Sequence, residues 1–289
     1  MTGTTNDDFI RCWTEILVPK WIRFRHVLSG NGAIHSRRAY EYFDLQPGDN
    51  VLDVGCGFGE TSIEIGELVG FSGNVVGLDC TQAFLDLAEE ERIAAGADNV
   101  EFICGDAQFI DLGTRDYFDV IHSRFGVMFF ASAVAALRNC SKALRPGGKL
   151  CLIVWRNLSE NPAWHCGKNV ALKYLPEPGD DKETCGPGPF SWGGPNTDRA
   201  MLEAAGFPDI EVFERIDAEI FMGRTLEEAI DFQILVGPSG EIIREAGPLA
   251  EPVLPKIRAD LAEYLTPHLR EDGVYLPSSS WAIVARKPG

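Results

Sequence analysis

From residue 50 onward, short apolar runs rich in β-branched residues alternate with segments of helical spacing. The strand-like runs are, in order, NVLDVG, NVVGLD, NVEFICGD, YFDVIHS and KLCLIVW. The segments between them include GETSIEIGELVG, TQAFLDLAEEERIAAG and ASAVAALRNCSKALRPGG, the last of which we expect to end at Pro146-Gly147-Gly148. Such alternation predicts βαβ units with right-handed crossovers, and therefore an α/β fold built on a parallel sheet.

The pattern changes after Trp155. Residues 157–195 are rich in Gly, Pro and polar side chains, and this composition predicts a long loop. A helix in TDRAMLEAAG and a strand in DIEVFERI follow, residues 217–277 are mainly helical in pattern, and SSWAIVARKP reads as a last strand. The first 45 residues carry no strand pattern. They place six apolar side chains near helical spacing: Phe9, Trp13, Ile16, Leu17, Trp21 and Phe24. That stripe predicts a helix packed on the core or, alternatively, a lid over a ligand.

The first strand-like run and the turn that follows it read VLDVGCGFGE, with glycines at positions 55, 57 and 59. In an open α/β sheet, ligands bind beyond the carboxyl ends of the strands, commonly at the first strand-to-helix turn. Glycine suits that turn because it adopts backbone angles that a Cβ forbids and lets a ligand approach the main chain. Three spaced glycines alone are a weak signal, since a tight turn without a ligand also uses them.

Polar residues follow the next three strands as well. VVGLD ends in Asp79, whose carboxylate suits two ribose hydroxyls. CGDAQFI places Asp106 where it could meet an adenine amino group, with the backbone NH of Ala107 toward a ring nitrogen, and VIHSRFGVMFF ends the fourth strand at Ser123. Together these positions indicate one adenosine-containing ligand.

Two cofactors contain adenosine and use such a turn, NAD and S-adenosylmethionine. The dinucleotide fingerprint is G-x-G-x-x-G, and its helix N-terminus faces a pyrophosphate. Here the third glycine comes one residue early, and Glu60 begins the helix, where a carboxylate would repel a pyrophosphate. S-adenosylmethionine has no phosphates, so the spacing and the charge favour the methyl donor.

The motifs VLDVGCGFGE, VVGLD, CGDAQF, SRFGVMFF and ALRPGGKL resemble those of the class I S-adenosylmethionine-dependent methyltransferases. The similarity is strongest to the branch that resembles the ubiquinone/menaquinone-biosynthesis C-methyltransferases. It covers residues 45–215 and the last strand, and it is weak over the first 45 residues. It implies a Rossmann-like, seven-stranded mixed sheet with helices on both faces and a reversed last strand.

The resemblance also implies a cofactor site. Its expected residues are Gly55, Cys56 and Gly57 along the methionine part, Asp79 at the ribose, Cys80 on the adenine, Asp106 and Ala107 at the adenine edge, and Ser123 near the amino group. One position departs from the family, because Phe58 stands where a Thr or another small residue is usual. Phe58 is a candidate for shaping the acceptor side.

Methyl transfer from a sulfonium is an in-line displacement, and alignment of nucleophile and methyl group can supply much of the acceleration. A general base is needed only when the acceptor must lose a proton. The candidate bases are His122, His35 and His165, each of which could equally be structural or lie on the surface. No His/carboxylate pair has metal-ligand spacing, so we expect no metal.

The acceptor pocket is expected to include the aromatic side chains outside the motifs, namely Trp13, Trp21, Trp164, Phe190, Trp192, Phe221 and Phe232. Aromatic lining suits a small hydrophobic or aromatic acceptor. We therefore expect an N-terminal helical lid (1–45), a cofactor-binding core (46–216), a helical insertion that caps the acceptor (217–277) and a final core strand (278–289). The alternatives are a non-catalytic S-adenosylmethionine-binding relative and a nicotinamide-dependent oxidoreductase.

The formal net charge of −17 argues against nucleic acid as a partner, because binding to phosphates relies on Lys and Arg. The longest nearly uncharged stretch, Phe125 to Leu137, is too short to cross a bilayer, so no membrane insertion is expected. The eight cysteines form no CxxC pair, several lie in apolar runs, and the N-terminus has no secretory pattern. These features predict free thiols and a cytoplasmic protein, and they leave a homodimer open.

Overall fold

The computed structural model describes residues 6–113, 116–178, 186–192 and 194–289. Its strands are β1 (Asn50–Val54), β2 (Asn74–Asp79), β3 (Val100–Cys104), β4 (Phe118–Arg124), β5 (Leu144–Trp155), β6 (Asp209–Gly223), β7 (Leu269–Arg270) and β8 (Gly273–Arg286). Seven of them form the path β3-β2-β1-β4-β5-β8-β6, and the short β7 pairs with β8. β1 to β5 pair in parallel, whereas β8 runs antiparallel to both of its neighbours, β5 and β6. The expected mixed sheet with a reversed last strand is confirmed.

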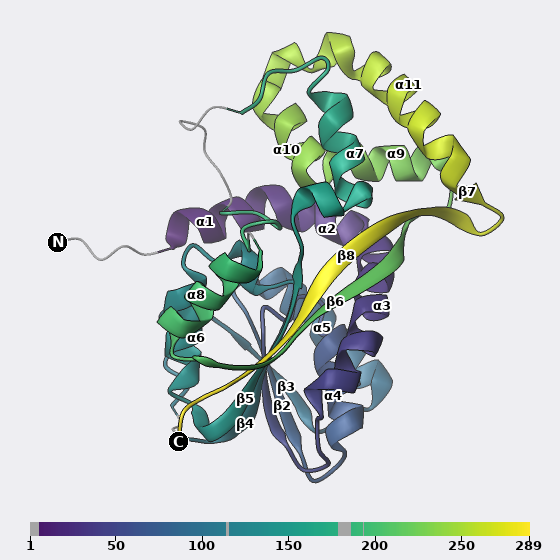
Figure 1. Cartoon of the computed structure of the whole chain (residues 1–289). Coiled ribbons are helices and arrows are strands. Elements are labelled where there is room, and N and C mark those ends of the chain that lie inside the picture. The colour runs from purple at the N-terminus through teal and green to yellow at the C-terminus, as the bar shows by residue number, and fades with distance from the viewer. Residues whose placement is uncertain (1–5, 114–115, 179–185, 193) are drawn as a thin grey trace.

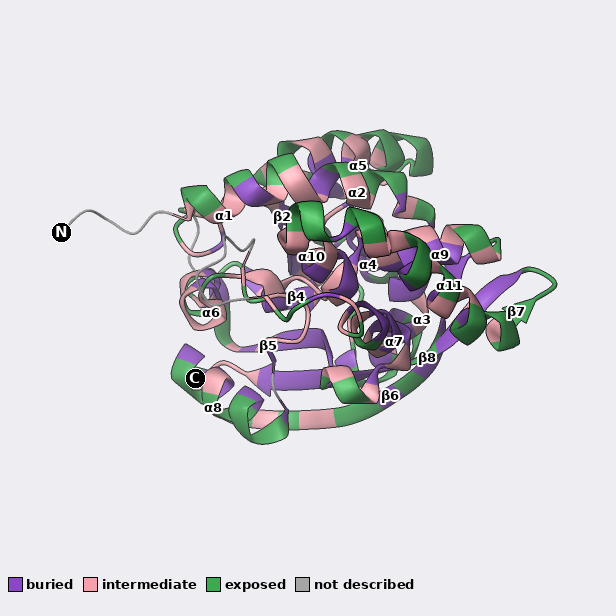
Figure 2. Cartoon of the chain, turned by 90° about the horizontal axis from the view of Figure 1, so that it is seen from above, coloured by how far each residue is buried: buried purple, intermediate pink, exposed green. Residues whose placement is uncertain are grey.

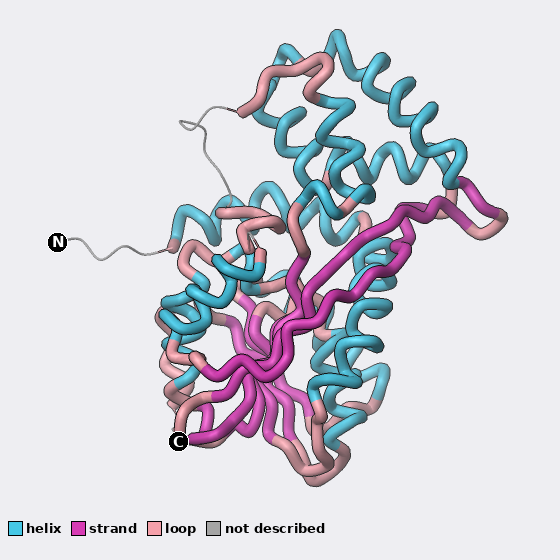
Figure 3. Tube along the Cα trace, viewed as in Figure 1, coloured by secondary structure: helices cyan, strands magenta, loops and turns pink. Residues whose placement is uncertain are grey.

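Helices cover both faces of this sheet (Figure 1). One face carries α3 (Arg25–Phe43), α4 (Glu60–Val69) and α5 (Gln82–Ala95), and the other carries α6 (Ala133–Ser141) and α8 (Pro195–Ala205). Figure 3 shows the same layering along the chain trace.

Alternate residues of each strand supply the two cores. Val51 and Val120 pack with Phe43 of α3 and Ile65 of α4, whereas Leu52 and its neighbours pack with the other layer. This period of two is what a sheet that is buried on both faces requires. Figure 2 shows buried strands between partly exposed helices.

The N-terminal segment crosses above the carboxyl ends of the parallel strands as α1 (Asp7–Cys12), a π-helical turn (Trp13–Leu17) and α2 (Val18–Arg23) (Figure 1). Its side chains reach the core through aromatic contacts. Trp13 meets Phe129 with ring centroids 5.0 Å apart, and Trp21 meets Phe84 at 6.2 Å. The segment is thus held to the sheet's upper edge.

A helical cap lies beyond this segment. It consists of α7 (Pro162–Ala171), α9 (Leu226–Leu235), α10 (Gly237–Ala246) and α11 (Leu254–Leu265), which pack on one another. The upper parts of β6 and β8 extend as a two-stranded ribbon to the cap (Figure 1).

Short 3-10 turns lie between the elements along the chain. They are Val127–Phe129, Leu158–Glu160, Gly247–Leu249, Glu251–Val253 and Thr266–His268.

Three boundaries differ from the sequence prediction. The expected loop over residues 157–195 contains α7, although residues 179–185 and 193 lie outside the described part. The last strand begins at Gly273 rather than at 278, and β6 continues to Gly223, because the two strands pair along their whole length. β5 begins at Leu144, and the register shift between Phe118 and Val120 accommodates the Pro-Gly-Gly segment within the strand.

The cysteines also differ in one respect. The thiols of Cys56, Cys80, Cys104, Cys140, Cys151 and Cys166 are free, as expected. Cys12, at the end of α1, is disulfide-bonded, which the lack of CxxC spacing did not predict. Among the described residues, no helix has the length and apolar character that crossing a membrane requires.

Candidate functional site

A cavity of about 540 Å³ lies where the carboxyl ends of the parallel strands meet the N-terminal helices and the cap. Its walls come from the turn after β1, the ends of β2 to β5, the helices α1 to α3, residues 186–190, and the cap helices α7 and α10. Chain segments far apart in the sequence therefore share one cavity, of the size that small ligands and cofactors occupy.

The glycine turn forms one wall. Gly55, Gly57 and Gly59 all have positive φ, at 72°, 56° and 77°. A Cβ on Gly55 would lie 2.9 Å from the Cα of Gly126, and one on Gly59 would meet the ring of Phe102 at 2.6 Å. A Cβ on Gly57 would meet nothing within 4 Å, because Gly57 faces the cavity. Two glycines thus allow close packing, and the third leaves its main chain open to a ligand.

The strand ends next to this turn present carboxylates. Asp79 accepts hydrogen bonds from the backbone NH groups of Gly57 (3.0 Å) and Thr81 (2.9 Å). Burial raises the pKa of Asp79, and these two donors act in the opposite direction. Asp106 accepts from the NH of Gln108 and from the side chain of Asn6, both at 2.8 Å. Asn6 precedes α1, so the N-terminal segment touches this end of the cavity.

Seven of the eight expected cofactor residues line the cavity: Gly55, Cys56, Gly57, Asp79, Cys80, Asp106 and Ala107. Burial raises the pKa of the Cys80 thiol to about 12, so this side chain is a neutral wall. Ser123 lies elsewhere. Its fully buried hydroxyl donates to the carbonyl of Val54 at 2.7 Å and accepts from the NH of Val127, so it ties β4 to β1.

The three candidate histidines are not among the described residues that line the cavity. His122 is fully buried, and its Nδ1 lies 2.8 Å from Asp53 Oδ1, while Ser62 donates to the other oxygen of Asp53. His35 is fully buried between serine hydroxyls of β8, because α3 turns it toward the sheet. His165 lies on α7 and contacts Asn169. The geometry gives His122 and His35 structural surroundings, whereas His165 is half-buried on the cap.

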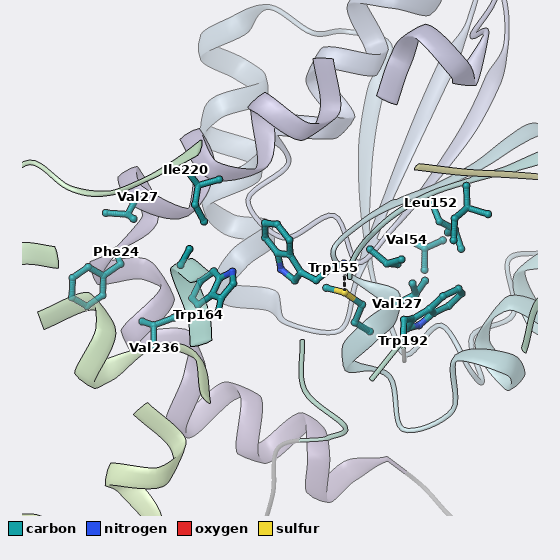
Figure 4. Close-up of a cluster of buried hydrophobic side chains, with 14 of the residues drawn as sticks. Phe24, Val27, Val54, Val127, Leu152, Trp155, Trp164, Trp192, Ile220 and Val236 are labelled. Carbon is teal, nitrogen blue, oxygen red and sulfur yellow. Dashed lines mark hydrogen bonds between the residues drawn. The ribbon is translucent and has the colours of Figure 1, made fainter. Parts of the chain in front are cut away.

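Aromatic rings form another part of the wall. Phe125, at the end of β4, stacks on Trp155, at the end of β5, with centroids 4.0 Å and planes 13° apart. Phe125 has a φ of 55°, which is an outlier for a bulky residue. Trp164 of α7 lies next to Trp155 with centroids 6.2 Å apart (Figure 4).

Of the expected acceptor-side aromatics, Trp13, Trp21, Trp164 and Phe190 line the cavity. The other three do not line it, because Trp192 and Phe232 are fully buried in the core and Phe221 packs on Tyr275. Phe58 lines the cavity, with its ring 4.7 Å from that of Phe84 and under the guanidinium of Arg25. It joins the turn to the N-terminal helices rather than standing alone on the acceptor side.

Two polar residues that line the cavity, Ser29 and Arg124, were given no role in the sequence analysis. Arg124 pairs with Glu60 at 3.2 Å, and Ser29 donates to the same carboxylate. Gly32 on α3 leaves room for the guanidinium of Arg124, which a Cβ would approach to 2.7 Å. Because Arg124 partly compensates the charge of Glu60, the glycine spacing is the stronger of the two arguments against a pyrophosphate.

Residues 45–205, more than half of the chain, match the family model described as "Methyltransferase domain". The chain belongs to this methyltransferase family. Its cofactor is S-adenosylmethionine. The residues present fit that cofactor, because Gly57 opens its main chain to the cavity, which Asp79 and Asp106 also line.

The methyltransferase is similar to curated and solved proteins. It is 29% identical over 172 residues to the demethylmenaquinone methyltransferase of Listeria monocytogenes serotype 4a (strain HCC23). The aligned region covers 59% of this chain and 72% of the relative. A putative methyltransferase from Bacillus halodurans C-125 shares the fold with a TM-score of 0.57 and 21% identity, over 88% of this chain and 98% of the other. The [4+2]-cyclase SpnF also shares it, with a TM-score of 0.53 and 19% identity, over 89% of this chain and 80% of the other.

Proposed function

We propose that this methyltransferase transfers the methyl group of S-adenosylmethionine to a small hydrophobic or aromatic acceptor. The observation that carries the proposal is the single cavity of about 540 Å³ that joins the glycine turn to the stacked rings of Phe125 and Trp155. A cofactor on the turn and an acceptor against the rings would share this one cavity. The name of the Listeria relative, a demethylmenaquinone methyltransferase, is consistent with a hydrophobic acceptor.

In this proposal, Asp79 holds the ribose, Asp106 and Ala107 contact the adenine edge, and Gly55 and Gly57 face the methionine part. Bound S-adenosylmethionine supplies an activated methyl group on its sulfonium. The protein's contribution is alignment of the acceptor atom with that methyl group and exclusion of water, which can supply roughly 7–11 kcal/mol in favourable cases. No histidine is among the described lining residues, so we assign no general base to the chain.

The first test compares cofactors by thermal unfolding. S-adenosylhomocysteine at 100 times its Kd should stabilise the protein by about 2.7 kcal/mol, whereas NADH should leave the unfolding temperature unchanged. A matched pair of variants tests whether this stabilisation comes from binding in the cavity. Gly57→Ala and Gly147→Ala each place a Cβ at positive φ with nothing within 4 Å, but only Gly57 lines the cavity. Gly57→Ala should reduce the rise in unfolding temperature that S-adenosylhomocysteine causes, and Gly147→Ala should leave that rise unchanged.

The second part of the test is transfer itself. Label from the methyl group of S-adenosylmethionine should appear in members of a panel of small aromatic and aliphatic compounds, and not in RNA. Stabilisation by NADH instead of S-adenosylhomocysteine would overturn the proposal. Stabilisation by S-adenosylhomocysteine without transfer to any member of a broad panel would favour a non-catalytic binding protein, because a fold alone does not define a function.

A further inference from the structure

We propose that Asn31 and Trp164 form a polar subsite for the acceptor, which recognises a neutral oxygen, a hydroxyl or a carbonyl, on an otherwise apolar molecule. This inference rests on the proposed function, because it concerns the acceptor part of the same cavity. Both side chains line the cavity, Asn31 from α3 and Trp164 from α7. Neither belongs to a sequence motif of the cofactor site.

Asn31 is the first of the two observations. Its side chain is 3% exposed, and neither its amide nitrogen nor its amide oxygen has a hydrogen-bond partner in the described part of the chain. Buried amides are nearly always hydrogen-bonded, because an unmade bond leaves the desolvation of the group uncompensated. An unpartnered amide beside a cavity therefore indicates a group whose partner is a ligand.

Trp164 is the second, independent observation. Its indole Nε1 is also buried without a partner among the described residues. Its ring lies 5.6 Å from that of Phe232 and belongs to the same buried hydrophobic cluster as Val236 and Ile220 (Figure 4). An indole N–H is a donor only, so the group that meets it must be an acceptor.

The helix places the two side chains toward one region. Val27, Asn31 and His35 lie at intervals of four on α3 and so share a face. His35 on that face meets the ring of Trp155 with centroids 5.0 Å apart, and Trp155 in turn adjoins Trp164. Asn31 therefore lies at the level of the tryptophan pair, beside the stacked Phe125 and Trp155 that we assign to the acceptor.

The surroundings decide the charge of the ligand group. The charged lining residues near the two side chains already have partners. Arg124, beside Gly32, is paired with Glu60. Lys168, four residues after Trp164 on α7, is paired with Glu177 at 3.2 Å, and Glu241 on α10 is paired with Arg244. A carboxylate or an ammonium among the rings around Trp164 would have to displace one of these ion pairs, which is costly in an apolar site. A neutral oxygen suits both groups chemically, because it can accept from the Trp164 indole and from the Asn31 amide, and a hydroxyl can also donate to Asn31 Oδ1.

The test measures the binding of 1-naphthol and 1-methylnaphthalene to the protein saturated with S-adenosylhomocysteine, by titration calorimetry or by quenching of tryptophan fluorescence. The two probes differ by one hydroxyl in place of a methyl group. We expect the wild-type protein to prefer 1-naphthol by at least about fivefold, which is the range that one net hydrogen bond supplies. 1-Tetralone, a carbonyl analogue, distinguishes the two kinds of oxygen.

Three variants test which side chains cause the preference for 1-naphthol over 1-methylnaphthalene. Asn31→Leu and Trp164→Phe should each reduce it to less than about twofold. Trp192→Phe is the matched control, because the Trp192 indole N–H is also buried and unpartnered but does not line the cavity, and this variant should keep the preference. Asn31→Leu should also unfold at the same or a higher temperature than the wild type without ligand, because it removes an unsatisfied buried amide.

A wild-type protein that binds neither probe, or binds both equally, would overturn the inference. So would a preference that persists in both Asn31→Leu and Trp164→Phe, or one that Trp192→Phe abolishes to the same degree. These outcomes are distinguishable from failure of the proposed function, because S-adenosylhomocysteine binding is measured first in every variant. Loss of cofactor binding in the wild type would contradict the cofactor assignment, whereas an unchanged probe preference with intact cofactor binding contradicts the subsite alone.

Discussion

The imidazole of His35 lies between two serine hydroxyls of β8, and the bonds around it define its tautomer. Ser278 donates its hydroxyl hydrogen to the carbonyl of Ala218 at 2.8 Å, so its oxygen accepts from His35 Nε2 at 2.9 Å. Nδ1, 2.8 Å from the Ser280 hydroxyl, is then the acceptor of the neutral ring. Burial, with a smaller contribution from the Arg38 guanidinium, lowers the pKa of His35 to about 3.

This lowered pKa predicts a loss of stability in mild acid. The unfolded chain protonates His35 near its ordinary pKa of about 6.5, and the folded protein does so only near 3. The contribution of the neutral His35 ring to the free energy of unfolding is therefore complete above about pH 6.5 and is lost as the pH falls toward 3. Between pH 7 and 5, the free energy of unfolding of the wild type should fall by about 2 kcal/mol more than that of His35→Gln, measured by urea titration. Parallel pH profiles would contradict the assignment.

At the residue scale, the sequence identified the groups that directly follow the strands. Gly57, Asp79 and Asp106 lie where the motif spacing placed them, at the edge of one cavity. Ser123 and His122 lie within β4, just before its end, where side chains alternate in direction, and the sequence does not show which side faces the ligand. Asn31 gave no signal, because an unsatisfied amide is visible only in a packed structure.

At the scale of elements, the N-terminal helices close one side of the cavity through an aromatic cluster. Trp13 meets Trp21 at 5.3 Å and Phe129 at 5.0 Å between ring centroids, and both tryptophans line the cavity. We propose that the segment acts as the lid expected from the sequence.

The lid hypothesis predicts a change in ligand kinetics. Trp13→Ala should speed dissociation of S-adenosylhomocysteine about tenfold, because it removes about 1–2 kcal/mol of apolar contact that holds the segment closed. Ile22→Ala is the matched control, since Ile22 belongs to the same segment but is 40% exposed and does not line the cavity. Stopped-flow release measures both rates. Equal rates in the two variants would show that the segment does not retain the ligand.

The elements that the sequence mispredicted are those whose local composition conflicts with their packing. α7 lies in a Gly- and Pro-rich region, yet Pro162 occupies its first turn and Asn161 holds the preceding chain by donating to the carbonyl of Arg156. Ala163, Trp164 and Val170 are then buried in the cap. Pro162 is a local signal for the start of a helix, but the Gly- and Pro-rich composition of the region outweighed it in the prediction.

At the scale of the whole molecule, the cavity exists only because the cap and the N-terminal helices meet over the sheet (Figure 1). The cofactor half could be predicted, because parallel strands bring their carboxyl ends to one edge. The acceptor half could not, because it depends on how helices separated by more than a hundred residues pack together. Three of the seven aromatic residues expected there serve the core or the β6–β8 ribbon instead.

The measurement that tests this account most directly is a crystal structure of the protein with S-adenosylhomocysteine. We predict that the ribose hydroxyls lie within hydrogen-bond distance of Asp79, with the adenine beside Asp106. The sulfur should face the space bounded by Phe125, Trp155 and Trp164. A ligand bound outside this cavity, or a sulfur atom turned toward closed protein rather than toward the aromatic wall, would contradict it.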